Sequence, residues 1–378
     1  MKLTALPSLL ALAVAGCATN SNNQPTVEQA QSKSDEQVGA AIGKWAQTAN
    51  FNGVVAIHYP GKTATILAFG EADQNTSRRL TTDSVFQTGS VGKFLTYIAA
   101  FAMDEEGLVD LHAPISSYLP GYREDIAKHV TLAQLMSNRS GITDKALRPI
   151  MGKIVGIRKE DPQIALTDIE GLPQSTDDTI SEYLSGDLLF EPGSKFDYAN
   201  SNWIIAQRIL EKASEKSYGA ILQQYVFAPA GMKNSGTFID SLQLTDKVLR
   251  DVAIGHNAAG TFYEGDFPLP SFIGGGTYIN AKDMLALMDA LYNGKILNLQ
   301  RLKEFSTIQT PEENYAFGGR IKNITNVHNS GYSWQSGSNG ATKMVAIYNL
   351  DTGYSFTALS NRAHDQEEMF DLGLKLEK

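Results

Sequence analysis

A serine and a lysine three positions apart, Ser90 and Lys93, stand where a polar turn runs directly into an apolar stretch. Residues at this spacing share one face of a helix and lie one turn apart. A serine hydroxyl is a poor nucleophile at neutral pH and needs a neighbouring proton acceptor. A lysine at the mouth of a buried helix is partly desolvated, which disfavours its charged form and lets it act as that acceptor. The pair therefore predicts nucleophilic catalysis at Ser90.

The same two residues also fit an alternative without chemistry. Serine is a common N-cap of helices, and a lysine often extends along apolar surface to place its amine in water. The Ser-x-x-Lys spacing alone does not separate these two interpretations. The residues after Lys93 are apolar almost all round, which is typical of a buried helix; they are Phe94, Leu95, Tyr97, Ile98 and Phe101, with Ala99 and Ala100 between.

Strands that could support this helix occur early and late in the chain. Residues 53–59 and 62–69 are β-branched runs separated by Pro60-Gly61, which predicts a hairpin. Residues 343–348 and 354–359 have the apolar or alternating pattern of sheet strands.

Helical patterns flank these strands, from Val38 to Trp45 and over residues 365–376. Because the early and late strands bracket a helical middle, we expect an α+β fold. It would consist of one antiparallel sheet flanked by terminal helices, with an all-helical lobe inserted. The active site would lie between sheet and lobe, where pockets are favoured. Residues 143–179 are polar, contain three prolines and show no clear periodicity, so we expect an irregular lid or a mobile insertion.

Composition restricts the class of protein. The chain has 378 residues and 42% hydrophobic content, which suffices for one large domain or two joined ones with a sizeable core. The net charge is -9, and no cluster of Lys and Arg is denser than Arg78-Arg79. Nucleic-acid partners need a basic stripe, so they are not expected.

The N-terminus resembles a bacterial lipoprotein signal. Residues 1–16 begin with Met-Lys, continue as an apolar run and end before Cys17, the chain's single cysteine. Cleavage there would expose Cys17 for lipid attachment and tether the protein to the membrane. The alternative is an ordinary secretory signal with an incidental cysteine. Residues 17–37 are polar and predict a flexible tether before a domain over residues 38–378. Ala18 follows Cys17 in place of the aspartate that signals inner-membrane retention, so we expect an outer-membrane lipoprotein facing the periplasm if the source is Gram-negative.

Several motifs together resemble one known family. With Ser90-x-x-Lys93, the chain resembles the serine β-lactamase-related family, which includes class C β-lactamases, penicillin-binding D,D-carboxypeptidases and esterases of the same fold. Asn138 stands where the family commonly has histidine, a change expected to be minor. The resemblance spans about residues 51–361, and its motifs lie in residues 105–120, 129–142, 190–203, 225–232 and 274–283.

The resemblance implies a Tyr-x-Asn element, matched here by Tyr198 and Asn200 after a Pro-Gly turn. A phenol can serve as a general base only beside a cation that stabilises the phenolate, so Tyr198 and Lys93 are predicted to act as a coupled pair. Asn200 would orient Lys93 or bind a substrate amide. Tyr278 and Asn280 have the same spacing but lack the Pro-Gly turn, so they are the weaker candidates.

The third motif of the family, after Ser-x-x-Lys and Tyr-x-Asn, is altered in this chain. Relatives carry Lys-Thr-Gly or His-x-Gly on the strand beside the nucleophile, whereas the aligned residues here are Gln335, Ser336 and Gly337. All three are predicted to contact substrate, with Gly337 allowing a close approach. His328 is an alternative source of the missing cation. By analogy the backbone N–H groups of Ser90 and Ser338 would form the oxyanion hole.

Three functions follow from these expectations. The first is a serine hydrolase that forms an acyl-enzyme at Ser90 on an ester, amide or lactam, with an esterase-like preference because Gln335 is neutral. A D,D-carboxypeptidase or class C-like β-lactamase is the alternative within this class. The second is a penicillin-binding lipoprotein that is acylated with little turnover, and the third is a catalytically silent scaffold. The substrate would be a small molecule or derived from peptidoglycan, and neither a metal nor another cofactor is expected.

Overall fold

The computed structural model describes residues 34–160, 169–173, 175–238, 251–256, 276–325, 327 and 329–378. The predicted signal peptide, Cys17 and His328 lie outside these residues. A long apolar helix able to cross a membrane does not occur within them.

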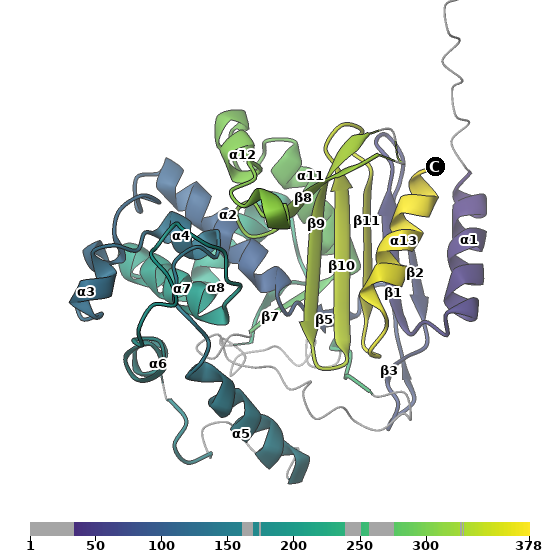
Figure 1. Ribbon diagram of the computed structural model, residues 1–378. Coiled ribbons are helices and arrows are strands. Elements are labelled where there is room, and N and C mark those ends of the chain that lie inside the picture. The colour runs from purple at the N-terminus through teal and green to yellow at the C-terminus, as the bar shows by residue number, and fades with distance from the viewer. Residues whose placement is uncertain are drawn as a thin grey trace, which may run out of the picture. The chain divides into compact units, whose positions relative to one another are not determined.

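A six-stranded antiparallel sheet forms the centre of the domain, in the order β2-β1-β11-β10-β9-β8. Figure 1 shows the late strands beside the first hairpin, as expected for an α+β fold of this kind. The predicted hairpin is confirmed, and the edge strand β8 is an addition that the sequence did not indicate. The strands are β1 (Gly53–His58), β2 (Thr65–Phe69), β8 (Arg320–Ile324), β9 (Ser330–Asn339), β10 (Thr342–Asn349) and β11 (Ser355–Ser360).

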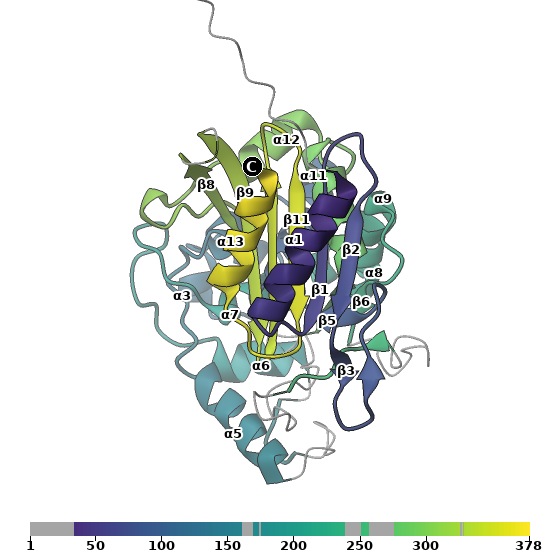
Figure 2. The same cartoon turned by 90° about the vertical axis from the view of Figure 1, so that its right-hand side faces the viewer.

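Two terminal helices, α1 (Asp35–Thr48) and α13 (Gln366–Glu377), cover one face of this sheet (Figure 2). Their apolar side chains pack with those of the sheet into one buried cluster. The helix α1 begins three residues before the predicted boundary at residue 38, because Ser34 and Gln37 form a reciprocal capping box. The predicted tether is therefore too long at its C-terminal end.

The opposite face carries α2 (Val91–Glu105), α11 (Ala281–Tyr292) and the helical lobe. The prediction that α2 is buried is confirmed, since every residue from Val91 to Met103 is buried. The remaining helices are α3 (Glu124–Ala127), α4 (Leu132–Met136), α5 (Leu147–Glu160), α6 (Thr176–Tyr183), α7 (Asn200–Ser214), α8 (Tyr218–Leu222), η3 (Gln223–Phe227), α9 (Ala228–Ala230) and α12 (Leu299–Phe305), with short 3-10 turns η1 (Ile115–Ser117) and η6 (Pro311–Glu313).

Two small sheets complete the fold. The first pairs β3 (Glu71–Asp73) with β4 (Arg78–Arg79). The second has the order β5-β7-β6, from β5 (Val85–Gln87), β6 (Gly236–Thr237) and β7 (Thr277–Asn280). Because β5 leads directly into the turn before α2, this small sheet helps to place Ser90.

The prediction that residues 143–179 are irregular is wrong over much of this segment, because α5 and the start of α6 fall within it. Ile150 and Ile154 are buried one turn apart on α5, an apolar spacing that the polar composition obscures. Pro149 lies in the first turn of the helix, where its missing N–H costs little.

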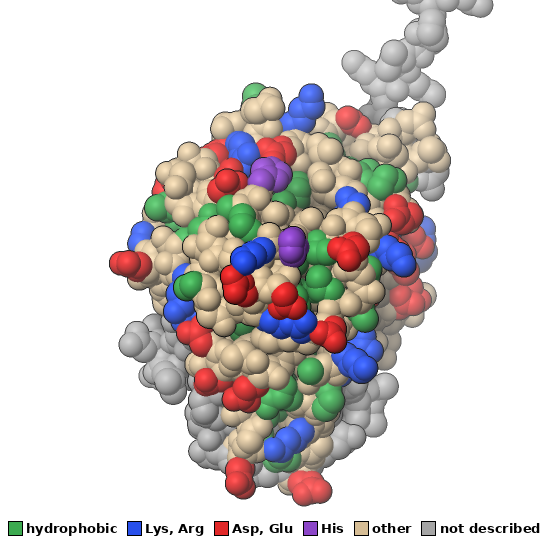
Figure 3. Space-filling model, turned by 60° about the vertical axis from the view of Figure 1, so that its left-hand side comes forward, with side chains coloured by type: hydrophobic (Ala, Val, Ile, Leu, Met, Phe, Trp, Pro, Cys, Tyr) green, Lys and Arg blue, Asp and Glu red, His purple; other side chains and the backbone are tan. Residues whose placement is uncertain are grey.

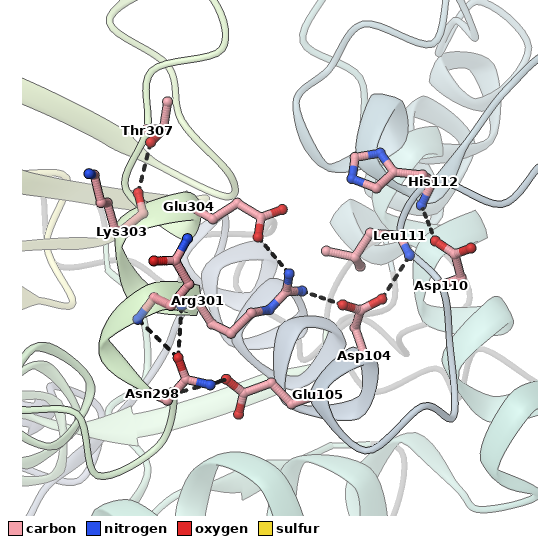
Figure 4. Close-up of polar contacts among 11 residues, drawn as sticks. Asp104, Glu105, Asp110, Leu111, His112, Asn298, Arg301, Lys303, Glu304 and Thr307 are labelled. Carbon is pink, nitrogen blue, oxygen red and sulfur yellow. Dashed lines mark hydrogen bonds and ion pairs between the residues drawn. The ribbon is translucent and has the colours of Figure 1, made fainter.

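The C-terminal end of α2 is anchored to α12, far from Ser90. Figure 4 shows Arg301 between Asp104 of α2 and Glu304, with an ion pair to each. Asn298 donates both its backbone N–H and its side-chain amide to Glu105. These contacts hold the helix that carries the predicted nucleophile.

The face of the domain in Figure 3 carries Lys and Arg side chains interspersed with Asp and Glu. No continuous stripe of one charge is visible on this face.

Candidate active site

Ser90 lies at the N-terminal end of α2, but its hydroxyl does not cap the helix. The side chain makes no capping hydrogen bond to the first turn, and Ser90 is partly exposed. Gly89 precedes it with φ of +51°, a left-handed conformation that favours glycine. The interpretation of Ser90 as a mere N-cap is therefore wrong, and its hydroxyl is available at the surface of the turn.

Lys93 is buried, with 2% of its surface exposed, so it does not extend to water. Its Nζ donates to Ser90 Oγ at 3.4 Å and to Asn200 Oδ1 at 2.8 Å. The amine also lies 5.0 Å from the ring centroid of Tyr198 and 4.9 Å from that of Trp203. The structure thus brings together the four residues that the two motifs predicted.

Tyr198 stands at the rim of the site, where 39% of its surface is exposed. Its backbone is held on both sides by Asn138, whose carbonyl accepts from Asp197 N–H at 2.9 Å and whose Oδ1 accepts from Ala199 N–H at 3.3 Å. Asn138 adopts φ of +56° and is fully buried. Asn138 therefore fixes the segment that carries Tyr198.

The strand β9 runs against the turn that carries Ser90. A Cβ atom on Gly337 would lie 1.9 Å from the carbonyl oxygen of Thr88, and one on Gly89 would lie 2.6 Å from the backbone nitrogen of Ser338. Asn339 also donates to Gln87 Oε1 at 2.5 Å. Gly337 is thus required for contact between strand and turn, a constraint separate from any approach of substrate. The contact brings the backbone nitrogen of Ser338 next to Gly89, the residue before Ser90.

Gln335 is almost fully buried, with 4% exposed, and its Nε2 donates to Ser333 Oγ at 3.1 Å. The side chain fills the space beside Gly319, where a Cβ would meet it at 2.2 Å. A buried, neutral amide therefore stands at position 335 of β9.

A cavity of about 280 Å³ contains the exposed parts of this arrangement. It includes Ser90, Tyr198, the predicted substrate-binding residues Gln335, Ser336 and Gly337 and the predicted oxyanion donor Ser338, together with Tyr315, Gly318, Gly319, Arg320, Trp334 and Gln366. Asn200, also predicted to bind substrate, does not line this cavity.

Tyr315 and Arg320 were not predicted from the sequence, because neither belongs to a motif with a readable spacing. The ring of Tyr315 is perpendicular to that of Tyr198 at a centroid distance of 6.4 Å. Burial raises the pKa of the Tyr315 phenol well above its ordinary value, and the neighbouring Tyr198 raises it further. Arg320 lies 5.5 Å from the centroid of the Tyr315 ring and 3.2 Å from Glu313. The site therefore contains a second phenol, which stays protonated, and a guanidinium.

The second Tyr-x-Asn pair lies elsewhere and has structural roles. Tyr278 is buried against Phe238, and Asn280 caps α11 by accepting from Asp283 N–H at 2.8 Å. Within the described residues, no group of three or more His, Cys, Asp or Glu side chains is arranged to hold a metal ion.

Comparison with known proteins supports the assignment of the fold and family. Residues 38–377 match the protein family described as Beta-lactamase. The chain is 28% identical to penicillin-binding protein 4* of Bacillus subtilis (strain 168) over 214 residues, 57% of this chain but only 42% of that protein. It is 25% identical to the teichoic acid D-alanine hydrolase of Staphylococcus aureus over 306 residues, 78% of this chain and 68% of that protein.

A solved structure shares the fold. The crystal structure of D-amino acid amidase from Ochrobactrum anthropi SV3, complexed with L-phenylalanine, superposes with a TM-score of 0.71 at 20% sequence identity. The superposition covers 90% of this chain and 98% of the amidase. The expected antiparallel sheet with terminal helices and an inserted helical lobe is confirmed.

Proposed function

Because the chain belongs to the beta-lactamase family of serine hydrolases, we propose that it acts through an acyl-enzyme at Ser90. The observation that carries this proposal is the pair of hydrogen bonds from Lys93, 3.4 Å to Ser90 Oγ and 2.8 Å to Asn200 Oδ1. These contacts place a buried amine beside a hydroxyl that does not cap its helix.

The residues suggest the following sequence of steps. The coupled pair of Lys93 and Tyr198 accepts the Ser90 proton while Oγ forms a bond to the substrate carbonyl carbon. Backbone N–H groups of Ser90 and Ser338 stabilise the resulting oxyanion. The intermediate then collapses, the bond to the leaving group breaks, and the proton passes to that group. Water then forms a bond to the acyl carbon while the Lys93–Tyr198 pair accepts its proton, and the bond from that carbon to Ser90 Oγ breaks as the proton passes to Oγ.

We propose an esterase-like preference, because Gln335 is neutral. A hydrogen bond to a charged partner contributes about 1.5–3 kcal/mol, against about 1 kcal/mol for a neutral pair. A substrate carboxylate therefore gains less from Gln335 than from the lysine or histidine of relatives, whereas an uncharged ester loses little.

One observation favours the alternative of an anionic substrate, such as a D,D-peptide or a β-lactam. Arg320 lines the same cavity, and its single carboxylate partner there, among the described residues, is Glu313 at 3.2 Å. Its guanidinium could hold a carboxylate in place of the missing cation. Slow turnover after acylation, as in a penicillin-binding protein, is a third outcome that kinetics distinguish.

The deciding experiment is intact-mass spectrometry of wild type and Ser90→Ala after incubation with a panel of acyl donors. The panel contains a penicillin, a cephalosporin, a D-Ala-D-Ala peptide, a D-alanyl ester and a short-chain p-nitrophenyl ester. We expect an adduct on wild type that maps to Ser90 and is absent from the variant, with the fastest acylation by the esters. An adduct on another serine would refute the assignment, and a burst without steady turnover would indicate a binding role.

We further propose that Cys17 carries a lipid that anchors the domain to the membrane on the periplasmic side. The support is the signal-like segment that ends at this cysteine. Metabolic labelling with a clickable fatty acid should mark the wild type and leave Cys17→Ser unlabelled. Equal labelling of both would show that the cysteine is incidental.

A further inference from the structure

Asp144 connects a loop outside the predicted motifs to the centre of the site. Its side chain is 8% exposed and accepts four hydrogen bonds at the first turn of α7. One oxygen, Oδ2, accepts from the backbone N–H of Asn200 at 2.9 Å and from its Nδ2 at 3.1 Å. The other, Oδ1, accepts from the backbone N–H of Ser201 at 2.8 Å and from its hydroxyl at 2.6 Å.

These bonds replace a missing helix cap. Ala199 precedes α7 and has no side chain able to cap it. A negative charge at a helix N-terminus that accepts its free N–H groups is favourable. If the role of Asp144 were only structural, its loss would affect only the stability of α7.

The bond to Nδ2 does more, because it fixes which way the Asn200 amide faces. Since a carboxylate only accepts hydrogen bonds, it holds the NH₂ group of Asn200 and turns the carbonyl oxygen in the opposite direction. That oxygen, Oδ1, accepts from Lys93 Nζ at 2.8 Å. With the amide reversed, its oxygen would face the Asp144 carboxylate, and the contact from Lys93 Nζ to Oδ1 would be lost with it.

We propose that Asp144 is a positioning residue for the acylation of Ser90, acting through the Asn200 amide on Lys93. The chain of contacts runs from the Asp144 carboxylate to Asn200, then to Lys93, then to Ser90. This role rests on the proposed acyl-enzyme function. Asp144 touches no reacting atom, so its effect is on where the Lys93 amine lies.

The experiment compares variants at the two oxygens of Asp144. Asp144→Ala should slow acylation by a p-nitrophenyl ester about 10- to 100-fold, as expected when a catalytic group loses its alignment. Asp144→Asn should keep most of the wild-type rate, because its carbonyl oxygen can still accept from Asn200. Its NH₂ group would then face the Ser201 backbone N–H, which is also a donor, so this variant should lower the melting temperature more than the rate. Ser201→Ala is the matched control, because it removes a bond from the other oxygen only. It should lower the melting temperature without slowing acylation.

A double-mutant cycle separates positioning from capping. If Asp144 acts through the Asn200 side chain, adding Asp144→Ala to Asn200→Ala should slow acylation by no more than about threefold. Multiplicative losses, or equal losses in Asp144→Ala and Ser201→Ala, would overturn the proposal.

A second measurement does not depend on turnover. The side-chain ¹⁵N–H₂ signal of Asn200, identified by its loss in Asn200→Ala, should exchange slowly in wild type and in Asp144→Asn but rapidly in Asp144→Ala. Equal exchange in all three would refute the contact. A wild type that is not acylated at all would refute the proposed function, while this exchange measurement would still decide the contact of Asp144 with Asn200.

Discussion

The Nζ atom of Lys93 lies over the face of the Tyr198 ring, 5.0 Å from its centroid. Lys93 is buried, whereas 39% of the Tyr198 surface is exposed. At this distance the buried amine packs over the aromatic ring, so removing either side chain changes the surroundings of the other. We therefore expect the two side chains to act as one unit.

If they do, Lys93→Ala and Tyr198→Phe should each slow acylation by about 10²- to 10⁴-fold, the range that a general base contributes. The double variant should be little slower than either single variant. Single-turnover kinetics with a p-nitrophenyl ester measure all three. Tyr278→Phe, in the unused Tyr-x-Asn pair, is the control and should retain the wild-type rate. Additive losses would mean that the two residues work independently.

The neutral charge of Gln335 should determine substrate preference. We expect Gln335→Lys and Gln335→His to raise kcat/KM for nitrocefin relative to p-nitrophenyl butyrate by about tenfold, equivalent to about 1.4 kcal/mol. Steady-state kinetics with both substrates give the ratio. The charge argument fails if wild type already hydrolyses nitrocefin efficiently, or if neither variant changes the ratio.

Arg320→Met tests the other source of positive charge in the same cavity. Methionine retains an apolar stem over Tyr315 but removes the guanidinium, so packing changes less than charge. If Arg320 holds a substrate carboxylate, kcat/KM for nitrocefin should fall by about tenfold or more while that for the butyrate ester is nearly unchanged. A parallel loss with both substrates would assign Arg320 a structural role.

Gly337→Ala should inactivate the enzyme because the added Cβ clashes with the protein backbone, and not because it blocks the substrate. The added Cβ would lie 1.9 Å from the Thr88 carbonyl, a backbone atom that cannot move alone. We expect acylation to fall by about 100-fold and the melting temperature to decrease. Gly43→Ala on α1 meets nothing within 4 Å and should be neutral or stabilising. Unchanged acylation in Gly337→Ala would contradict the tight contact between β9 and the turn.

His256 should make stability depend on pH near neutrality. It is 1% exposed, and its Nε2 accepts from Gln74 N–H at 3.1 Å, which requires the neutral ring. Burial lowers the pKa of His256 below 6.5, and Arg362 lowers it further, although Asp73 and Glu71 act in the opposite direction.

Because the folded protein binds this proton less readily than the unfolded chain, stability should be full above about pH 6.5 and decrease as the pH falls below it. Chemical denaturation at pH 7.5 and 5.5 should show a smaller difference for His256→Gln than for wild type. Equal differences would show that other groups govern this range.

The short motifs were predictable from the sequence because local geometry fixes them. The spacing of Ser90 and Lys93 places them on one helical turn, and the strands flanking the lobe have clear patterns. Asp144 and Arg320 were not predictable, since each reaches the site only through tertiary contacts and neither belongs to a sequence motif with a recognisable spacing. The helix α5 was missed because its buried isoleucines are interrupted by charged residues and glycines.

The contact of Gly337 with Thr88 joins two parts of the chain that the ribosome makes at different times. Ser90 leaves the ribosome early, whereas β9 and the backbone of Ser338 are made only after the helical lobe is complete. A nascent chain halted within the lobe therefore contains the nucleophile without its second predicted oxyanion donor or the strand that braces its turn. Such fragments are expected to be inert toward esters, so reactivity at Ser90 reports that the chain has been completed and folded.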